Sequence, residues 1–157
     1  MRKFWLATLV ALVAAPAFAQ LPNPYGASVT LDQAKKIAAL SVAEAAKNNW
    51  KMAVAIVDVA GDLVYFEKMD GTQVASVNIA QDKARSSVRF KRPTKAMQDV
   101  LAAGGAGVRF LALQGAIPVE GGLPLLIDGK IVGAIGASGG TSDQDGLTAK
   151  AGADSVK

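Results

Sequence analysis

The sequence predicts an α+β domain in which helices pack on an antiparallel sheet. Two hairpin signals favour antiparallel pairing, because the short turns at Asp128-Gly129 and Ala60-Gly61-Asp62 each lie between two apolar, strand-like runs. The third observation is the order of the segments, which runs helix, two strands, two helices, three strands and helix. This order makes consecutive strands neighbours, as antiparallel hairpins require.

The N-terminal residues have the three-part layout of a secretory signal peptide. Arg2 and Lys3 precede an apolar run from Phe4 to Ala15, and Ala17-Phe18-Ala19 provides an A-x-A cleavage site. The apolar run is shorter than the roughly 20 residues of an ordinary membrane span, and no later uncharged stretch reaches that length. We therefore expect a periplasmic or secreted protein without a membrane span after cleavage, with an uncleaved anchor as the competing interpretation.

Cleavage after Ala19 divides the chain into a signal peptide over residues 1–19, an extended leader over 20–29 and one domain over 30–157. Loss of the two basic residues near the N-terminus lowers the formal net charge of +4 by two, which does not suggest a nucleic-acid partner. The chain contains no cysteine and no histidine. These absences exclude disulfides, thiolate catalysis, Ser-His-Asp triads, and ligation of a metal or haem by either residue.

The first part of the domain is expected to hold one helix and one hairpin. Thr30-Leu31-Asp32-Gln33 matches a capping box, so a helix is expected to run from there to about Lys47. Strands are expected over Met52–Val59 and Leu63–Lys68. Asp58 interrupts the first of them, where its side chain is expected to bond to the following turn rather than to serve as a functional carboxylate.

The second part is expected to begin with two helices. The first is predicted over about Val74–Arg89, and the second begins after a break at Pro93-Thr94 and ends near Ala102. Val108–Leu113 is ambiguous between helix and strand, and we favour a short helical or irregular segment. A third strand is predicted over Ala116–Val119, with its proline suited to an edge or a strand end.

The stretch from Gly121 to Asp145 is the first place to look for a ligand site. It holds the Asp-Gly hairpin and leads into a final helix expected over about Asp143–Val156, capped by Thr141 or Ser142. Before that helix, Ser138-Gly139-Gly140 places small residues where backbone amides can converge on an anion. The alternative is that this glycine-rich turn only reverses the chain.

The densest basic cluster lies on the helices of the central part. Its members are Lys83, Arg85, Arg89, Lys91, Arg92 and Lys95. Because the overall charge is so mild, a solvated helix face is favoured over a dedicated anion site. Lys83 is set apart, since its helical spacing places it close to the apolar face, where its ammonium group can reach over a pocket.

Three segments together resemble one known family. They are VAIVDVAGDLVYFEKMDG (54–71), SVNIAQDKARSSVRFKRPT (76–94) and EGGLPLLIDGKIVGAIGASGGTSDQD (120–145). From about Leu31 to Ala153 the chain closely resembles the GlcG/HbpS-like haem-binding family, which is related to the C-terminal domain of PduO-type proteins. The resemblance implies a profilin-like fold with a five-stranded antiparallel sheet flanked by helices, and assembly into homo-oligomers.

The resemblance also implies haem or another tetrapyrrole as ligand in some members, and an unassigned role beside glycolate or diol metabolism in others. Without histidine, iron ligation would fall to Tyr65, Met69 or Lys83, or the porphyrin would be held by its propionates and apolar contacts alone. Each residue also has a structural interpretation. Tyr65 suits a half-buried strand aromatic, Met69 a gap-filling core residue, and Lys83 an ion pair to Asp70 or Glu120.

Binding or turnover of a small, glycolate-like organic acid is the second hypothesis. Its carboxylate would be bound by Lys83, Arg109 and the amides around Gly139-Gly140. Glu120 is the candidate base for turnover, because burial against Gly121-Gly122 would raise its pKa. The third hypothesis is a ligand-free interaction module for an exported or membrane-bound partner.

We therefore expect an exported, homo-oligomeric protein that binds a small molecule, with haem as the possible cofactor, and that is not an enzyme by itself. The candidate ligand-binding residues are Met69, Asp70, Lys83, Arg109, Glu120, Gly121, Gly122, Ser138, Gly139, Gly140 and Thr141. No catalytic residue and no metal site are assigned.

Overall fold

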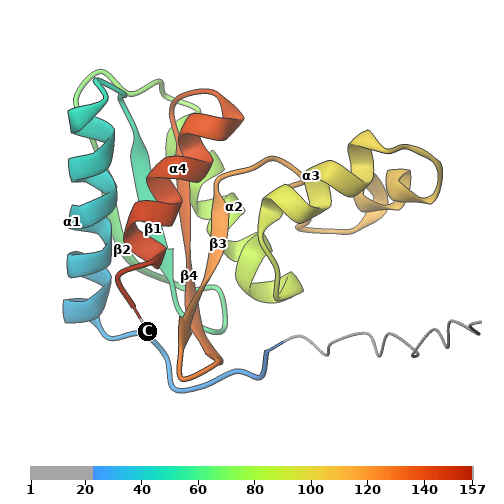
Figure 1. Cartoon of the computed structure of the whole chain (residues 1–157), viewed down its shortest axis with the longest axis horizontal. Coiled ribbons are helices and arrows are strands. Elements are labelled where there is room, and N and C mark those ends of the chain that lie inside the picture. The colour runs from blue at the N-terminus through green and yellow to red at the C-terminus, as the bar shows by residue number, and fades with distance from the viewer. Residues whose placement is uncertain (1–22, 157) are drawn as a thin grey trace, which may run out of the picture.

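An antiparallel sheet of four strands forms the centre of the protein (Figure 1). The strands are β1 (Ala53–Val57), β2 (Leu63–Lys68), β3 (Gly122–Ile127) and β4 (Lys130–Ser138), in the spatial order β2-β1-β4-β3. The structure is a computed structural model that describes residues 23–156, so the predicted signal peptide lies outside the described residues. The predicted α+β architecture is confirmed.

Both predicted hairpins are present, and their turn residues explain them. The Asp58 carboxylate accepts hydrogen bonds from the amides of residues 60–62 at 2.9, 3.0 and 2.9 Å, which closes the turn between β1 and β2 as predicted. Between β3 and β4, φ is 49° at Asp128 and 71° at Gly129. Both values are positive, as a two-residue type I′ turn requires.

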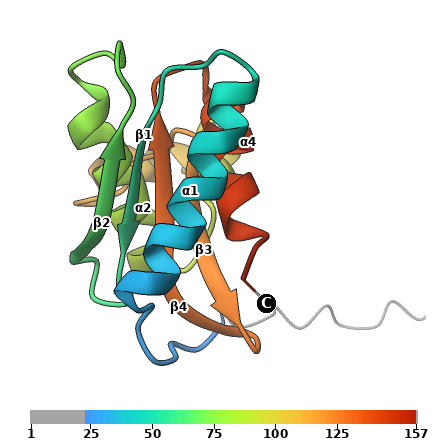
Figure 2. The ribbon, with the colours of Figure 1, turned by 90° about the vertical axis from the view of Figure 1, so that its left-hand side faces the viewer.

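Helices cover both faces of the sheet (Figure 2). Helices α1 (Leu31–Lys47) and α4 (Ser142–Ala153) lie side by side on one face, and α2 (Ser76–Phe90) lies on the other. Val54 and Ile56 of β1 point toward α1 and α4, whereas Ala53 and Ala55 pack with Ala80 and Ala84 of α2. This alternation follows from the two-residue period of a strand buried on both faces.

The two main helix starts are capped as the sequence predicts. Thr30 and Thr141 each form a complete capping box, with Gln33 and Gln144 as the reciprocal partners. Thr141 rather than Ser142 is therefore the cap of α4. Within residues 23–156, no helix is long and apolar enough to cross a membrane.

The fifth strand implied by the resemblance is missing from the described sheet, and the prediction of a strand over Ala116–Val119 was wrong. The amide of Ile117 donates to the Ser86 hydroxyl at 2.9 Å, so this segment is bonded to the side of α2 rather than to a strand. Pro118 also has no amide to donate to a ladder. The segment connects a projecting arm to β3 and adds nothing to the sheet.

That arm consists of α3 (Thr94–Ala102) and the 3₁₀ helix η1 (Gly105–Ala112), which extend away from the sheet (Figure 1). The helical interpretation of the ambiguous segment Val108–Leu113 is thus confirmed as far as Ala112. The described part of the leader instead lies against β4. Tyr25 forms a parallel bridge with Ile131 of β4. This bridge precedes Ala134–Ser138, the part of β4 that pairs with β1.

Candidate functional site

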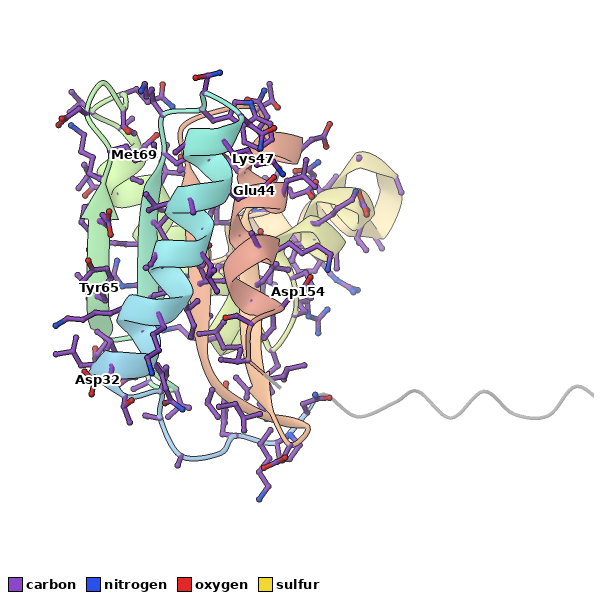
Figure 3. All side chains as sticks on the ribbon, turned by 60° about the vertical axis from the view of Figure 1, so that its left-hand side comes forward. Asp32, Glu44, Lys47, Tyr65, Met69 and Asp154 are labelled. Carbon is purple, nitrogen blue, oxygen red and sulfur yellow. The ribbon has the colours of Figure 1, made fainter. Side chains whose placement is uncertain are left out.

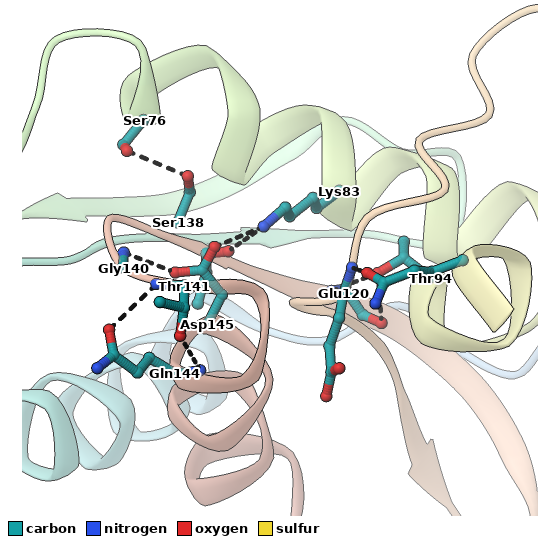
Figure 4. Close-up of polar contacts among 12 residues, drawn as sticks. Ser76, Lys83, Thr94, Glu120, Ser138, Gly140, Thr141, Gln144 and Asp145 are labelled. Carbon is teal, nitrogen blue, oxygen red and sulfur yellow. Dashed lines mark hydrogen bonds and ion pairs between the residues drawn. The ribbon is translucent and has the colours of Figure 1, made fainter. Parts of the chain in front are cut away.

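A buried ion pair joins α2 to α4 at one end of the sheet (Figure 4). Lys83 Nζ lies 2.6 Å from Asp145 Oδ2 and donates to the Ala137 carbonyl oxygen at 3.3 Å. Lys83 is 1% exposed and Asp145 is 3% exposed, so water does not screen the pair. The second carboxylate oxygen of Asp145 accepts from the Gly140 amide at 3.0 Å. Burial raises the pKa of Asp145, whereas its bonds to Lys83 and Gly140 act in the opposite direction.

Many of the predicted ligand residues gather around this pair. They are Lys83, Gly121, Gly122, Ser138, Gly139, Gly140 and Thr141. A Cβ atom at Gly121, whose φ is +126°, would lie 2.9 Å from Lys83 Nζ and from Asp145 Cβ, and one at Gly122 would lie 2.4 Å from the Lys83 carbonyl oxygen. The two glycines are therefore explained by close packing around Lys83.

Two of the groups predicted to bind a ligand carboxylate, the Lys83 ammonium group and the Gly140 amide, are already bonded within the protein. Lys83 and the Gly140 amide both bind Asp145, and the Ser138 hydroxyl donates to the Ser76 hydroxyl at 3.1 Å. The Asp145 carboxylate thus occupies the position in which a bound organic acid was expected. This arrangement disfavours the organic-acid hypothesis in the form given above.

The predicted ion-pair partners of Lys83, Asp70 and Glu120, were wrong. Asp70 is exposed in the turn after β2, and the side chain of Glu120 points away from Lys83 (Figure 4). Asp145 was missed because an acidic residue in a first helical turn is usually explained by the helix dipole. Its spacing was the available signal, since Asp145, Ala149 and Gly152 lie on one buried face of α4.

Four predicted residues lie away from the ion pair. Tyr65 lies on β2 and Met69 directly follows that strand, at the sheet edge opposite to β3 (Figure 3). The Tyr65 hydroxyl donates to Glu67 at 3.1 Å, and this bond raises the pKa of Tyr65. Asp70 is exposed beside Met69, and Arg109 is exposed on η1. Tyr65, Met69 and Lys83 therefore do not converge on one iron position.

A large cleft follows the free edge of the sheet at β3, with a volume of about 890 Å³. We call it the β3 cleft. Its apolar walls come from Leu123, Pro124, Leu126, Ile131, Ala153 and Val156. Its charged lining residues are Lys91, Lys150 and Asp154. None of these residues was among the predicted ligand-binding residues, because the cleft forms only where β3, α4 and the leader meet.

A smaller cleft of about 400 Å³ shares Pro93, Leu123 and Lys150 with the first. We call it the Glu120 cleft, because Glu120 lies in its wall, together with Gly121 and Gly122. The Glu120 amide is not available to a ligand, since it donates to Gln98 Oε1 at 2.7 Å. Burial raises the pKa of Glu120, as the sequence predicts for a carboxyl group packed against these glycines.

Residues 29–154 match the family model described as "Haem degrading protein HbpS-like". The chain belongs to the HbpS-like family. The family match spans the sheet, helices α1 to α4 and the Glu120 cleft, and it leaves out Asn23 and Val156 of the β3 cleft. The resemblance stated from the three sequence segments is confirmed.

Known proteins of related sequence or structure agree with the HbpS-like assignment. Protein GlcG of Escherichia coli (strain K12) is 37% identical over 105 residues, which cover 67% of this chain and 77% of GlcG. A double mutant of Streptomyces reticuli HbpS is 27% identical, with a TM-score of 0.77 over 97% of this chain and 99% of HbpS. PduOC, crystallised as a haem complex, shares the fold, with 23% identity and a TM-score of 0.74 over 83% and 96% of the two chains.

Proposed function

We propose that the mature protein binds haem or a related tetrapyrrole in the β3 cleft, without histidine ligation. The observation that carries this proposal is the cleft itself, an apolar groove of about 890 Å³ with two lysines in its lining. Small-molecule sites typically measure about 300–1,000 Å³ and combine apolar walls with a few polar groups. The family description as haem-degrading and HbpS-like supports the same ligand class.

The residues of the β3 cleft fit the porphyrin better than they fit the iron. Leu123, Pro124 and Ile131 offer apolar surface to the macrocycle, while Lys91 and Lys150 offer ammonium groups to the two propionates. Lys150 is held by an exposed pair to Asp154, which contributes little stability and can be exchanged for a propionate. Among the described residues, no tyrosine or methionine lines this cleft. A bound haem would supply its own iron chemistry, and this chain would supply the apolar walls and the two cations.

Hemin titration tests this site through its two lysines. We expect a saturable change in the Soret band with the wild-type mature protein. Its dissociation constant for hemin should be about tenfold lower than that of the double variant Lys91→Gln/Lys150→Gln. Each exposed charge pair contributes up to about 1 kcal/mol, and a tenfold change in affinity corresponds to about 1.4 kcal/mol. Lys47→Gln is the matched control, since Lys47 is exposed on α1 outside the cleft. The proposal would be contradicted by the absence of a saturable change at micromolar protein. Equal hemin affinity in Lys91→Gln/Lys150→Gln and in the Lys47→Gln control would also contradict it.

We further propose that the protein is exported and assembles as a homo-oligomer. Cleavage after Ala19 follows from the signal-peptide pattern. The projecting arm and the segment that connects it to β3 support assembly, because they expose the apolar residues Val100, Val108, Leu111, Leu113 and Val119. An exposed apolar surface of this kind is typical of contact with another protein surface. Native mass spectrometry of the exported protein is expected to show a chain beginning at Gln20 in assemblies of several copies; a monomeric, uncleaved chain would contradict both statements.

A further inference from the structure

The Glu120 cleft contains one charged group that the described part of the chain leaves without an ion-pair partner. Lys95 Nζ lies 2.8 Å from Asp99, and Lys150 Nζ lies 2.5 Å from Asp154. Both lysines of this cleft are thus neutralised locally, and so is Asp99. Glu120 makes no salt bridge within residues 23–156. The uncompensated charge of the cleft is therefore a carboxylate.

The fold makes room for this carboxyl group. A Cβ atom at Gly146 of α4 would lie 2.2 Å from Glu120 Oε1 and 2.7 Å from Cδ, so a side chain at this position would displace the carboxyl group from where it lies. Glu120 Oε2 is buried and has no hydrogen-bond partner among the described residues. A buried acceptor left without a donor costs about 1–3 kcal/mol, and more when it is charged. The site therefore lacks a donor that a ligand can provide.

We propose that the Glu120 cleft binds the primary ammonium group of a small aliphatic amine, with the Glu120 carboxylate as its ion-pair partner. Ala96, Leu123 and Leu147 line the same cleft and contact the alkyl part. Rotation about the last side-chain bond of Glu120 is soft and exchanges its two oxygens, so a ligand in the cleft can bind either oxygen. The volume of about 400 Å³ limits the ligand to a small molecule.

The charges around Glu120 are consistent with a cationic ligand. Burial is the main cause of the raised pKa of Glu120, and Asp143 of α4 and Asp99 of α3 act in the same direction. Lys95 of α3 and Lys83 of α2 lower it. An ammonium group beside Glu120 replaces the lost hydration of the carboxylate and relieves repulsion from the two aspartates. Amine affinity is therefore expected to fall as the pH drops below this raised pKa, because protonation removes the charge that the amine binds.

The test uses n-butylammonium chloride as probe and ¹⁵N-labelled mature protein in amide NMR titrations. We expect saturable shifts at Gly121, Gly122 and Leu147, and a loss of affinity of about tenfold or more in Glu120→Gln, since hydrogen bonds to charged groups contribute about 1.5–3 kcal/mol. Asp143→Asn is the matched control. It removes the same charge from the same neighbourhood but does not line the cleft, and its affinity should stay within about threefold.

Three results would overturn the proposal: no saturable shift at these amides, equal amine affinity in Glu120→Gln and wild type, or n-butanol binding as tightly as n-butylammonium. The last result would show that Glu120 is neutral and binds hydroxyl groups. Glu120→Gln is expected to fold, because the Glu120 side chain makes no hydrogen bond to residues 23–156 that the variant would lose. Its hemin titration should match that of the wild type, so failure of the amine site and failure of the haem site are distinguishable.

Discussion

Replacing Lys83 by methionine is expected to lower the free energy of unfolding by about 3–5 kcal/mol, because it leaves a buried carboxylate without its counter-ion. Methionine keeps most of the length of the lysine stem, so the loss comes mainly from the charge. Lys83 and Asp145 are 1% and 3% exposed, which denies the remaining carboxylate access to water. Urea unfolding at pH 7 measures the loss.

The pH dependence of this variant separates a charge effect from a packing effect. Without Lys83, burial keeps the folded-state pKa of Asp145 above its unfolded value. The folded variant then binds the proton more tightly than the unfolded chain, so stability is present at low pH and lost as the pH rises through the folded pKa. The deficit relative to wild type should therefore be smaller near pH 4 than near pH 8. A deficit independent of pH would indicate a cavity rather than an unpaired charge.

A double variant tests whether the pair is the cause. Lys83→Met/Asp145→Asn removes both charges but keeps an oxygen that can accept from Gly140, so it should recover at least about half of the loss. Lys95→Met is the matched control. It breaks the ion pair between Lys95 and Asp99, which is similar in length to the buried pair but about half exposed. Exposed pairs of this kind contribute under about 1 kcal/mol. A similar loss in the control would contradict the special role of the buried pair.

The sequence predicts the local features of this fold well, because their causes lie within a few residues. The Asp128-Gly129 turn needs only two residues that tolerate positive φ, and the capping boxes at Thr30 and Thr141 need only four consecutive residues. The error at Ala116–Val119 has a non-local cause. The Ile117 amide is bonded to Ser86, which is 31 residues away on α2, and no local pattern indicates that partner.

The candidate site could be predicted only in part for the same reason. The helical period shows that Lys83 lies near an apolar face, but its partner depends on how α4 packs 62 residues later. The grouping of Glu120, Gly121 and Gly122 in one wall follows from adjacency in the chain. Their cleft also needs α3 and α4, whose relative positions no sequence motif specifies.

Gly136→Ala is expected to lower the free energy of unfolding by about 3 kcal/mol or more, at or above the upper end of the usual cost of overpacking. Gly136 lies in β4 beneath α2, and a Cβ atom there would lie 1.9 Å from the Ala80 carbonyl oxygen and 2.7 Å from the Ala84 amide nitrogen. Both obstructing atoms belong to the backbone of α2, so the helix itself must move. Elsewhere in a strand, the same substitution would be expected to stabilise the protein by about 0.5–1 kcal/mol.

The backbone origin of this contact leads to a sharper test. Ala80→Gly should not rescue Gly136→Ala, because it removes only a side chain and leaves the carbonyl oxygen in place. Gly26→Ala is the matched control, since a Cβ atom there would meet no backbone atom: its nearest neighbours are Lys130 Cβ at 3.0 Å and side-chain atoms of Lys130 and Val132 at 3.5 Å. A shift of a few tenths of an ångström is enough to accommodate it. The test compares thermal unfolding of the wild type, Gly136→Ala, Gly136→Ala/Ala80→Gly and Gly26→Ala. Rescue by Ala80→Gly, or an equal loss in the control, would mean that α2 does not rest on the β4 backbone at Gly136. A loss confined to the Gly136 variants would establish that contact.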